Sequence, residues 1–239
     1  MRDVLFLPLN NEKEIVISTD CSGAIGEKAG DEVYAPDRIV AYFSMRVAMM
    51  ELMAVGGTAS AVVLPNFTGD QAWSEYMEGI QQVFTELEIS PLPVIGSSET
   101  NMSLLQSAVG LTVLGGIYKE RKRIKRTPAD ACFAVIGEPL VGAPVLTEKE
   151  RVAPLSLFRK LLEIAEIYEV VPIGSKGILY EFGQLLKDNN LSDCNVHCFL
   201  DLYKSSGPAT CFLISYSKSA EEMIQQVAGR YYYNLHIQS

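Results

Sequence analysis

The sequence lacks the features that identify several common classes of protein. No apolar run reaches the roughly 20 residues that a membrane-spanning helix needs. The first residues carry charge too early, and are too few, to form a signal peptide, and they are more typical of a β-strand. The glycine stretch from Gly23 to Gly26 has neither the GxGxxG pattern nor the GK[ST] ending of a phosphate-binding loop. We therefore expect neither a membrane protein nor a Walker-type nucleotide-binding protein.

Residues that often ligate metals or form disulfides are scarce. The five cysteines, an odd number without CxxC spacing, predict reduced thiols in a cytoplasmic protein. His197 lies between Cys194 and Cys198, but three ligands so close together on one strand do not converge well, so core packing is favoured over a metal site. The other histidine, His236, has no expected role. Nothing in the sequence suggests a Ser-His-Asp triad.

Charge and length limit the remaining classes. A net charge of −9 argues against nucleic acid as a partner, because a basic surface supplies most of that affinity. The run 119–126 contains six Lys or Arg residues among eight, and in an acidic chain a solvated linker is favoured over a nucleic-acid contact. With 239 residues, the chain can form two compact domains. We expect them to span residues 1–118 and 127–239.

Strand and helix patterns alternate along the chain, which predicts a mixed α/β fold. Short β-branched or apolar runs bounded by turn residues mark the strands, and longer amphipathic segments with terminal signals mark the helices. The expected strands cover residues 15–19, 61–64, 94–95, 108–117, 131–136 and 211–216. The expected helices cover residues 38–55, 71–88, 156–168, 175–187 and 220–230.

Two carboxylates stand out in the first half. Asp20 ends an expected strand and precedes the glycine stretch, although a lone Asp in this position is often only a turn residue. Glu51 is the only acid between Arg38 and Gly57, on an otherwise apolar helix. It faces either solvent or a paired site, because burying a lone carboxylate is costly. Magnesium prefers oxygen ligands, usually one or two carboxylates with phosphates and water.

Glu99 lies in a loop of small residues that follows an expected strand. Strand ends are where α/β folds place ligands, and Gly96, Ser97 and Ser98 leave room for a phosphate or a base. The alternative is an ordinary cap, with Ser98 or Thr100 as the capping residue. Each of these signals is weak alone, and Asp3 on the first strand carries no information by itself.

The order of the motifs resembles the aminoimidazole ribonucleotide synthetase superfamily over nearly the whole chain. That group includes selenophosphate synthetase, thiamine-monophosphate kinase and a hydrogenase-maturation protein. Ile17-Ser18-Thr19-Asp20 resembles its strand ending in Thr-Asp, and Gly23 to Lys28 resembles its glycine loop. Met49 to Gly56 is similar to its Asn-x-x-Asp helix, and Ser97-Ser98-Glu99-Thr100 to its Gly-Gly-Glu/Asp-Thr loop.

The resemblance implies a two-domain fold whose N-terminal domains pair in a homodimer and share a β-barrel. ATP and magnesium are then expected in a cleft that the C-terminal domain covers. The implied metal ligands are Asp3, Asp20, Glu51 and Glu99. The implied nucleotide contacts are Asp20, Ser22, Gly23, Gly26, Ser97, Ser98 and Asn101. Lys28 and Lys176 are the implied catalytic residues, which would neutralise charge during phosphoryl transfer.

The sequence departs from the family pattern at three positions. Glu51 replaces the usual Asp of the helix motif, and Ala48 stands where Asn is common. The C-terminal motif Asp-x-Ser-Asp-Gly of the kinases reads Ile173-Gly174-Ser175-Lys176-Gly177. Lys176 would either stabilise the charge of a transferring phosphoryl group or be a solvated residue in the first turn of a helix.

The leading hypothesis is a magnesium- and ATP-dependent kinase that phosphorylates a hydroxyl group of a small nucleoside-like substrate. The motif combination resembles most closely a shorter branch associated with α-ribazole kinase, an enzyme of cobamide (cobalamin) salvage. One alternative is an ATP-dependent ligase of the synthetase type. Another is a non-catalytic, nucleotide-binding regulatory protein, which the lysine at position 176 keeps open. No membrane partner is expected.

Overall fold

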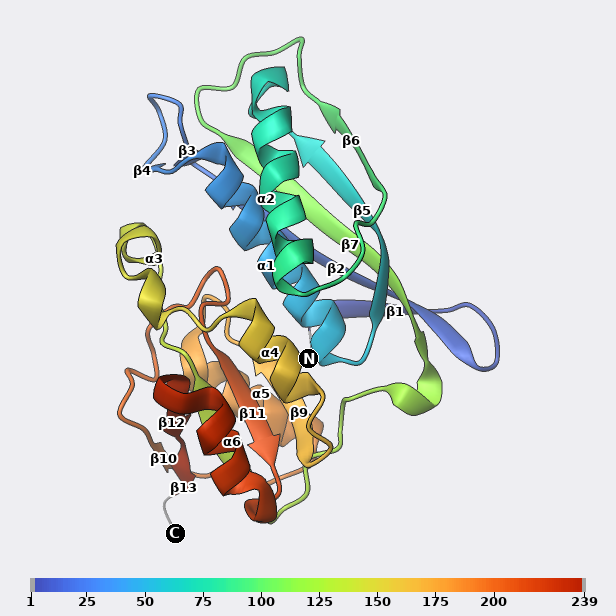
Figure 1. Ribbon diagram of the computed structural model, residues 1–239, viewed down its shortest axis with the longest axis vertical. Coiled ribbons are helices and arrows are strands. Elements are labelled where there is room, and N and C mark those ends of the chain that lie inside the picture. The colour runs from blue at the N-terminus through green and yellow to red at the C-terminus, as the bar shows by residue number, and fades with distance from the viewer. Residues whose placement is uncertain (1–2, 238–239) are drawn as a thin grey trace. The chain divides into compact units, whose positions relative to one another are not determined.

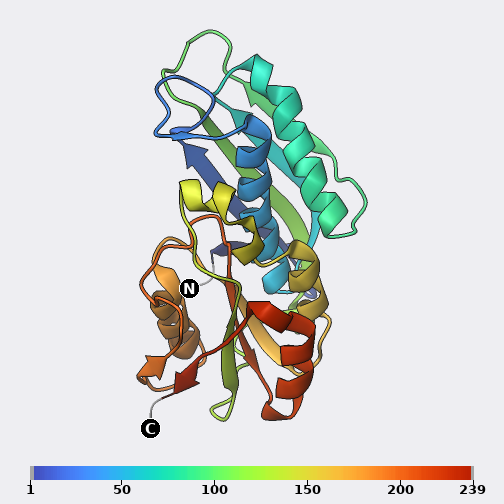
Figure 2. The same cartoon turned by 60° about the vertical axis from the view of Figure 1, so that its left-hand side comes forward.

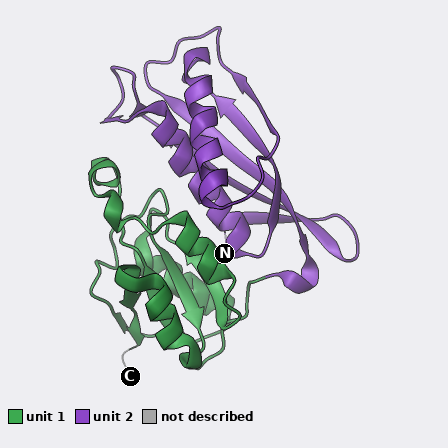
Figure 3. Cartoon of the chain, viewed as in Figure 1, with its two compact units in different colours: residues 1–2, 123–239 green, residues 3–122 purple. Residues whose placement is uncertain are grey.

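The computed structural model describes residues 3–237, which form two compact units (Figures 1 and 3). The first unit along the chain is Asp3–Lys122, which is purple and labelled unit 2 in Figure 3. The second is Arg123–Ser239, green and labelled unit 1 there, and described as far as residue 237. Each unit has its own sheet and its own buried core. Among the residues described, no helix is both long and apolar enough to cross a membrane.

A five-stranded sheet forms the centre of the first unit, with the strand order β1-β2-β7-β5-β6. Strands β5 and β6 are parallel, and the other neighbours are antiparallel. A short parallel pair, β3 and β4, lies apart from this sheet. The strands are β1 (Val4–Pro8), β2 (Lys13–Gly23), β3 (Ile25–Gly26), β4 (Val33–Tyr34), β5 (Thr58–Asn66), β6 (Val94–Ser98) and β7 (Ala108–Tyr118).

Two helices, α1 (Asp37–Ala54) and α2 (Trp73–Glu86), cover one face of this sheet (Figures 1 and 2). A 3-10 turn, η1 (Asp70–Ala72), leads into α2. Alternate residues of β7 point toward the helices, and Val109, Leu111 and Val113 are buried there. This period of two is what a strand with one covered face requires.

The opposite face of the sheet is mostly apolar, with the polar pair Thr19–Thr112 on it, and has no described helix of this unit over it. Leu5 pairs with Ile17, Ile17 with Leu114, and Leu114 with Ala61, so these side chains form one row across four strands. Leu5 is 54% exposed. We call this surface the uncovered face; its apolar residues are Leu5, Leu7, Ile15, Ile17, Ala61, Val63, Ile95 and Leu114.

The second unit has helices on both faces of a four-stranded antiparallel sheet, in the order β12-β8-β11-β9. Phe158 of α4 packs edge-on against Phe212 of β11 at 5.3 Å, and Phe182 of α5 packs against Phe133 of β8 on the other face at 5.1 Å. The strands are β8 (Cys132–Ile136), β9 (Ile167–Pro172), β10 (Val196–His197), β11 (Phe212–Tyr216), β12 (Tyr232–Asn234) and β13 (His236–Ile237). The helices are α3 (Ala143–Thr147), α4 (Leu155–Leu162), α5 (Gly177–Asp188) and α6 (Glu221–Ala228), and the 3-10 turns are η2 (Lys119–Arg121, in the first unit), η3 (Lys149–Arg151), η4 (Lys218–Ala220) and η5 (Gly229–Tyr231).

The basic run 119–126 is held by both units. Lys122 forms an ion pair with Glu14 in the first unit. Arg123 donates hydrogen bonds to the carbonyl oxygens of Leu162 and Ile167 in the second. Just beyond the run, Thr127 Oγ1 donates to the buried Glu169 carboxylate at 2.8 Å. The chain therefore passes from one unit to the other near Lys122.

Two expectations about elements are wrong. The helix expected over residues 156–168 ends at Leu162, and Ile167 begins β9. Residues of β9 pair with β11, and this pairing overrides the helical spacing of the preceding segment. The buried Glu169 on β9 also accepts hydrogen bonds from Thr127 and Asn189. Strand β2 also continues three residues past Asp20, so Asp20 lies within the strand rather than at its end.

We expect Gly79→Ala to destabilise the first unit by about 2–3 kcal/mol, because an added Cβ in a close-packed contact forces the backbone to move. A Cβ at Gly79 would lie 2.2 Å from the carbonyl oxygen of Arg38, where α2 crosses α1. Gly183→Ala on α5 is the matched control, because nothing lies within 4 Å of its Cβ position. That change should be neutral or stabilise by up to about 1 kcal/mol. Urea unfolding measures both, and equal effects would contradict the close approach.

Candidate functional site

Three strands of the first unit end at the same edge of the sheet. Strands β2, β5 and β6 run in one direction, because β7 is antiparallel to both β2 and β5 and β6 is parallel to β5. Their last residues are Gly23, Asn66 and Ser98. We call these strand ends, with the loops 24–36, 67–69 and 99–107, the loop edge. It collects most of the residues that the sequence suggested for nucleotide binding.

The predicted contacts share this edge but do not meet at one point. Ser22 pairs with Val109, Val109 with Asn66, and Asn66 with Ser98, so Ser22 and Ser98 occupy one row across the sheet. Three strand spacings separate them, which is about 14 Å. A ligand that contacts both residues must therefore extend along the edge, as a nucleotide with its phosphate chain would.

Asp20 is the partly buried carboxylate near this edge. It shares the helix-covered face of β2 with Ser18, whose hydroxyl donates to the carbonyl of Ala48 on α1 at 2.7 Å. Burial raises the pKa of Asp20 to about 6, opposed by hydrogen bonds from the Ser44 hydroxyl and the Cys21 backbone. Because burial disfavours the charged carboxylate of Asp20, a cation that approaches it would stabilise the ionised form.

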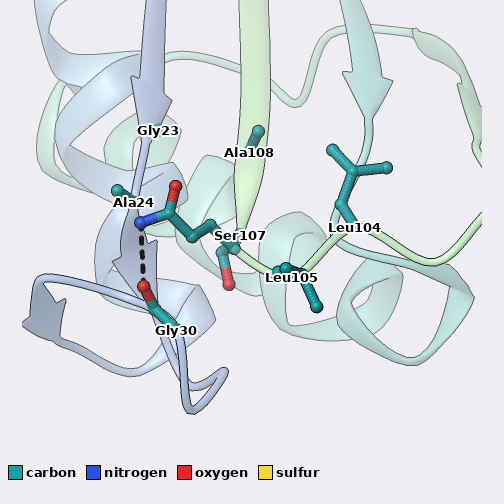
Figure 4. A pocket seen from close by; sticks show the side chains of 8 residues that line it. Gly23, Ala24, Gly30, Leu104, Leu105, Ser107 and Ala108 are labelled. Atoms are coloured by element: carbon teal, nitrogen blue, oxygen red, sulfur yellow. Dashed lines mark hydrogen bonds between the residues drawn. The ribbon is translucent and has the colours of Figure 1, made fainter.

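The glycine loop and the β6–β7 loop are held together by side-chain hydrogen bonds. Asp31 accepts hydrogen bonds from the backbone N–H and the hydroxyl of Ser107, both at 2.7 Å, and these lower its pKa against the effect of burial. Gln106 Nε2 donates to the carbonyl of Gly30 at 2.8 Å (Figure 4). The two loops thus form one connected wall of the loop edge.

A hollow of about 630 Å³ opens between these loops (Figure 4). Its volume is in the range of small-molecule sites. Gly23 faces open space, whereas a Cβ at Gly26 would lie 2.3 Å from Ser107 Oγ. The missing side chain of Gly26 therefore lets the two loops approach each other. The missing side chain of Gly23 leaves the backbone accessible to a ligand. The hollow is lined by Gly23, Ala24, Gly30, Leu104, Leu105, Gln106, Ser107 and Ala108.

Lys28 has a structural contact in this arrangement. Its ammonium group donates a hydrogen bond to the carbonyl of Leu104 at 3.0 Å, and its backbone N–H donates to Asp31 at 2.9 Å. To contact a phosphate, the Lys28 ammonium would have to break its hydrogen bond to the Leu104 carbonyl oxygen or donate to both acceptors at once. Its catalytic role stays a prediction.

Glu99 stabilises the turn that follows β6. One carboxylate oxygen accepts the backbone N–H groups of Asn101 at 2.7 Å and Met102 at 3.1 Å, and these hydrogen bonds lower the pKa of Glu99. No helix lies between β6 and β7 in the described chain, so the expected helix cap at Ser98 or Thr100 is wrong. Adjacent strand residues point to opposite faces, so Ser97 lies on the uncovered face and only Ser98 lies on the row with Ser22.

The remaining predicted residues lie in different surroundings. Glu51 is buried on α1 rather than facing solvent. Asp3 is exposed and directly precedes β1, whose first residue Val4 pairs with Ser18, so Asp3 lies beside β2. Lys176 belongs to the second unit, at the N-cap of α5, where its ammonium donates to the Tyr180 hydroxyl at 3.1 Å and lies over that ring.

The predicted carboxylates do not form a preassembled metal cage. Within residues 3–237, no group of three or more His, Cys, Asp or Glu side chains is placed to hold a metal ion. Magnesium often uses only one or two protein carboxylates and completes its shell with water and substrate phosphates. The carboxylate of Asp20 fits a magnesium ion that enters the site together with a nucleotide.

Sequence reasoning missed the polar network that supports the loop edge. Asn66 donates to Ser98 Oγ at 3.0 Å, and Thr68 forms a 2.6 Å hydrogen bond with the Tyr76 hydroxyl. Tyr76 also contacts Asp37, whose pKa is raised by burial and by nearby Glu27 and Asp31. The available signal was the Asn-x-Thr-Gly turn that follows β5, a composition typical of tight turns.

Comparisons with known proteins identify the fold. No family model matches the sequence, and no curated protein sequence matches it. The hydrogenase maturation protein HypE matches at 11% identity, with a TM-score of 0.67, over 100% of this chain and 84% of its own. Aquifex aeolicus ThiL, complexed with AMPPCP and TMP, matches at 8% identity and TM-score 0.64, over 100% of this chain and 85% of its own. This chain has their fold.

A third similar structure is much longer. T. maritima PurL, complexed with ADP, matches at 11% identity and TM-score 0.64, and the chain spans only 42% of its length. The predicted mixed α/β fold of the aminoimidazole ribonucleotide synthetase type is confirmed by these likenesses. The five-stranded sheet of the first unit is described in a single chain, so the barrel shared between two chains stays a prediction.

Proposed function

We propose that this chain binds ATP with magnesium and transfers the γ-phosphate to a hydroxyl group of a small nucleoside-like molecule. The whole-chain likeness to thiamine monophosphate kinase carries this proposal, because ThiL holds the ATP analogue AMPPCP together with TMP. PurL holds ADP on the same fold. Among acceptors, the sequence motifs favour a benzimidazole riboside of the α-ribazole type.

The loop edge is where we place the nucleotide. The open backbone at Gly23, with the hydroxyls of Ser22 and Ser98, lies along a row long enough for a phosphate chain. Asp20 is the carboxylate that would hold the magnesium ion, which neutralises phosphate charge when bound. Glu99 shapes the loop through its backbone contacts.

Catalysis by such a site depends on position and charge rather than on a nucleophile of the protein. Phosphoryl transfer proceeds with little covalent participation by the enzyme, so orientation and electrostatic stabilisation supply most of the rate. We propose Lys28 and Lys176 as the residues that neutralise the transferring group. Each first has to release its present partner, Leu104 for Lys28 and the Tyr180 hydroxyl for Lys176.

Phosphorus NMR tests the reaction directly. The chain is incubated with ATP, magnesium and a panel of nucleosides that includes α-ribazole, and the products are compared with those of Asp20→Asn. A new phosphomonoester signal that depends on the nucleoside and on Asp20 supports the kinase. Phosphate release that requires a nitrogen donor instead identifies a ligase. ATP binding without turnover of any substrate identifies a regulatory protein, and either of these results refutes the kinase proposal.

We also propose that the functional form is a homodimer joined through the uncovered face. In the part of the chain that the structure describes, helices cover both faces of the second unit's sheet but one face of the first unit's sheet. The exposed residues Leu5, Leu7 and Ile95 form part of a continuous apolar surface, and such surfaces mark association sites. A second copy of the same face is the occupant that the sequence resemblance implies.

A reducing, cytoplasmic location is proposed from the cysteines. Within the described residues none of the five cysteines forms a disulfide; Cys198 and Cys211 are buried, and Cys21 is exposed. Burial raises the pKa of Cys198, which keeps it as an unreactive thiol. Fractionation of cells that express the tagged full chain tests this placement, and recovery from an oxidising compartment would contradict it.

A further inference from the structure

The two histidines of the chain are brought face to face by the fold. Strands β10 and β13, both labelled in Figure 1, pair antiparallel. Val196 lies opposite Ile237, and His197 lies directly opposite His236. The sequence contains only these two histidines. Directly opposed residues of an antiparallel pair have Cβ atoms about 4.5–5.5 Å apart and project from the same face. Two imidazoles at this separation can ligate one ion.

The pair projects into solvent, and the thiols nearby do not share its face. His197 and His236 are both exposed, whereas the neighbouring residues Cys198 and Leu235 belong to the buried core under α5. The short ribbon therefore has an apolar side that packs inward and a histidine side that faces outward. The core packing expected for this segment is found for Cys198, which is buried, but not for His197, which is exposed.

We propose that His197 and His236 form a two-histidine site for a divalent transition-metal ion of the zinc, copper and nickel class. Neutral imidazole is the side chain that these ions prefer among nitrogen ligands. Within the described residues no third His, Cys, Asp or Glu completes a cluster, so water molecules fill the remaining positions. The ion links β10 to β13 and fastens the last strand of the second unit. This site is independent of the proposed kinase reaction.

Isothermal titration of the full chain with Zn²⁺, at pH 7.5 with a non-chelating reductant, tests the site. We expect one ion per chain, with binding weakened by at least about tenfold in His197→Gln and in His236→Gln, because each loses a ligand. Asn195→Ala is the matched control, because Asn195 is also exposed, lies two residues before His197 and offers no imidazole. It should bind as the unmodified chain does. Unchanged binding in both histidine variants would assign the ion to cysteines and overturn the proposal.

Proton NMR of the imidazole rings gives a second, independent measurement. With two histidines in the sequence, the ring signals are few enough to assign with the two variants. Both rings should shift together and reach their end point at one equivalent of Zn²⁺. A shift of only one ring, or no shift at one equivalent, would refute a shared ion. Because both residues are exposed, the variants should retain the circular dichroism spectrum of the unmodified chain.

Discussion

Replacing Asp20 with Asn is expected to abolish magnesium-dependent ATP binding and, at the same time, to stabilise the chain at pH 7. Binding is lost because the amide is neutral and cannot hold the ion as a carboxylate does. Stability increases because burial raises the pKa of Asp20 to about 6, so its ionised form is costly in the folded state. The pKa shift corresponds to about 1–3 kcal/mol after allowance for partial exposure.

The direction of the pH dependence follows from the raised pKa. The folded chain holds a proton on Asp20 more tightly than the unfolded chain does. The contribution of Asp20 to the free energy of unfolding is therefore complete below its ordinary pKa of 3.8 and is lost as the pH rises through about 6. Urea unfolding between pH 4 and pH 7.5 should therefore show the Asn variant gaining on the unmodified chain as the pH rises. ATP affinity of the unmodified chain should fall below pH 6, where Asp20 becomes protonated.

The control for both measurements is Asp130→Asn, because Asp130 is exposed and belongs to the second unit. This change should alter neither ATP affinity nor the pH profile. Titration calorimetry with magnesium and a non-hydrolysable ATP analogue measures the binding. Asp20→Asn with the affinity of the unmodified chain would remove Asp20 from the site, whatever its effect on stability.

Introducing a charge into the uncovered face should have the second largest effect. Ile17→Lys places an ammonium in the middle of the row formed by Leu5, Ile17 and Leu114. An unpaired charge buried in an interface costs about 3–5 kcal/mol, which corresponds to a dimer at least about 100-fold weaker. Sedimentation velocity at micromolar concentration should show the unmodified chain as a dimer and this variant as a monomer.

Met223→Lys is the matched control, because Met223 is an exposed apolar residue on α6 in the other unit, 42% exposed. It should remain a dimer. Circular dichroism separates dissociation from unfolding. The Ile17→Lys variant should keep the spectrum of the unmodified chain, because its new side chain projects from a face that the helices do not cover. A monomeric unmodified chain, or a dimeric Ile17→Lys variant, would contradict an interface on the uncovered face.

Local signals in the sequence were sufficient for the helices and strands that lie next to strong turn residues. The helix expected over residues 38–55 is α1, Asp37–Ala54, because a proline precedes it and Gly56 and Gly57 follow it. The strand expected over 108–117 is β7. Strand β9 was missed because its residues continue a helical spacing, and only pairing with β11 makes them a strand.

The assembly of the site depends on contacts that no local pattern specifies. Asp20 is on β2 and Glu99 directly follows β6, and β7 and β5 lie between these two strands in the sheet, an arrangement that the order of the motifs does not specify. The bonds of Asp31 to Ser107 and of Lys28 to Leu104 likewise join distant parts of the chain. The pairing of His197 with His236 has the same character, since each histidine alone has no evident role.

Hydrogen–deuterium exchange with magnesium and AMPPCP tests the central claim, nucleotide binding at the loop edge, most directly. The account predicts slower exchange in residues 23–34, 66–69 and 98–107 of the unmodified chain, and no such change in Asp20→Asn. Protection confined to other segments, or equal protection of these loops in the Asp20→Asn variant, would contradict it.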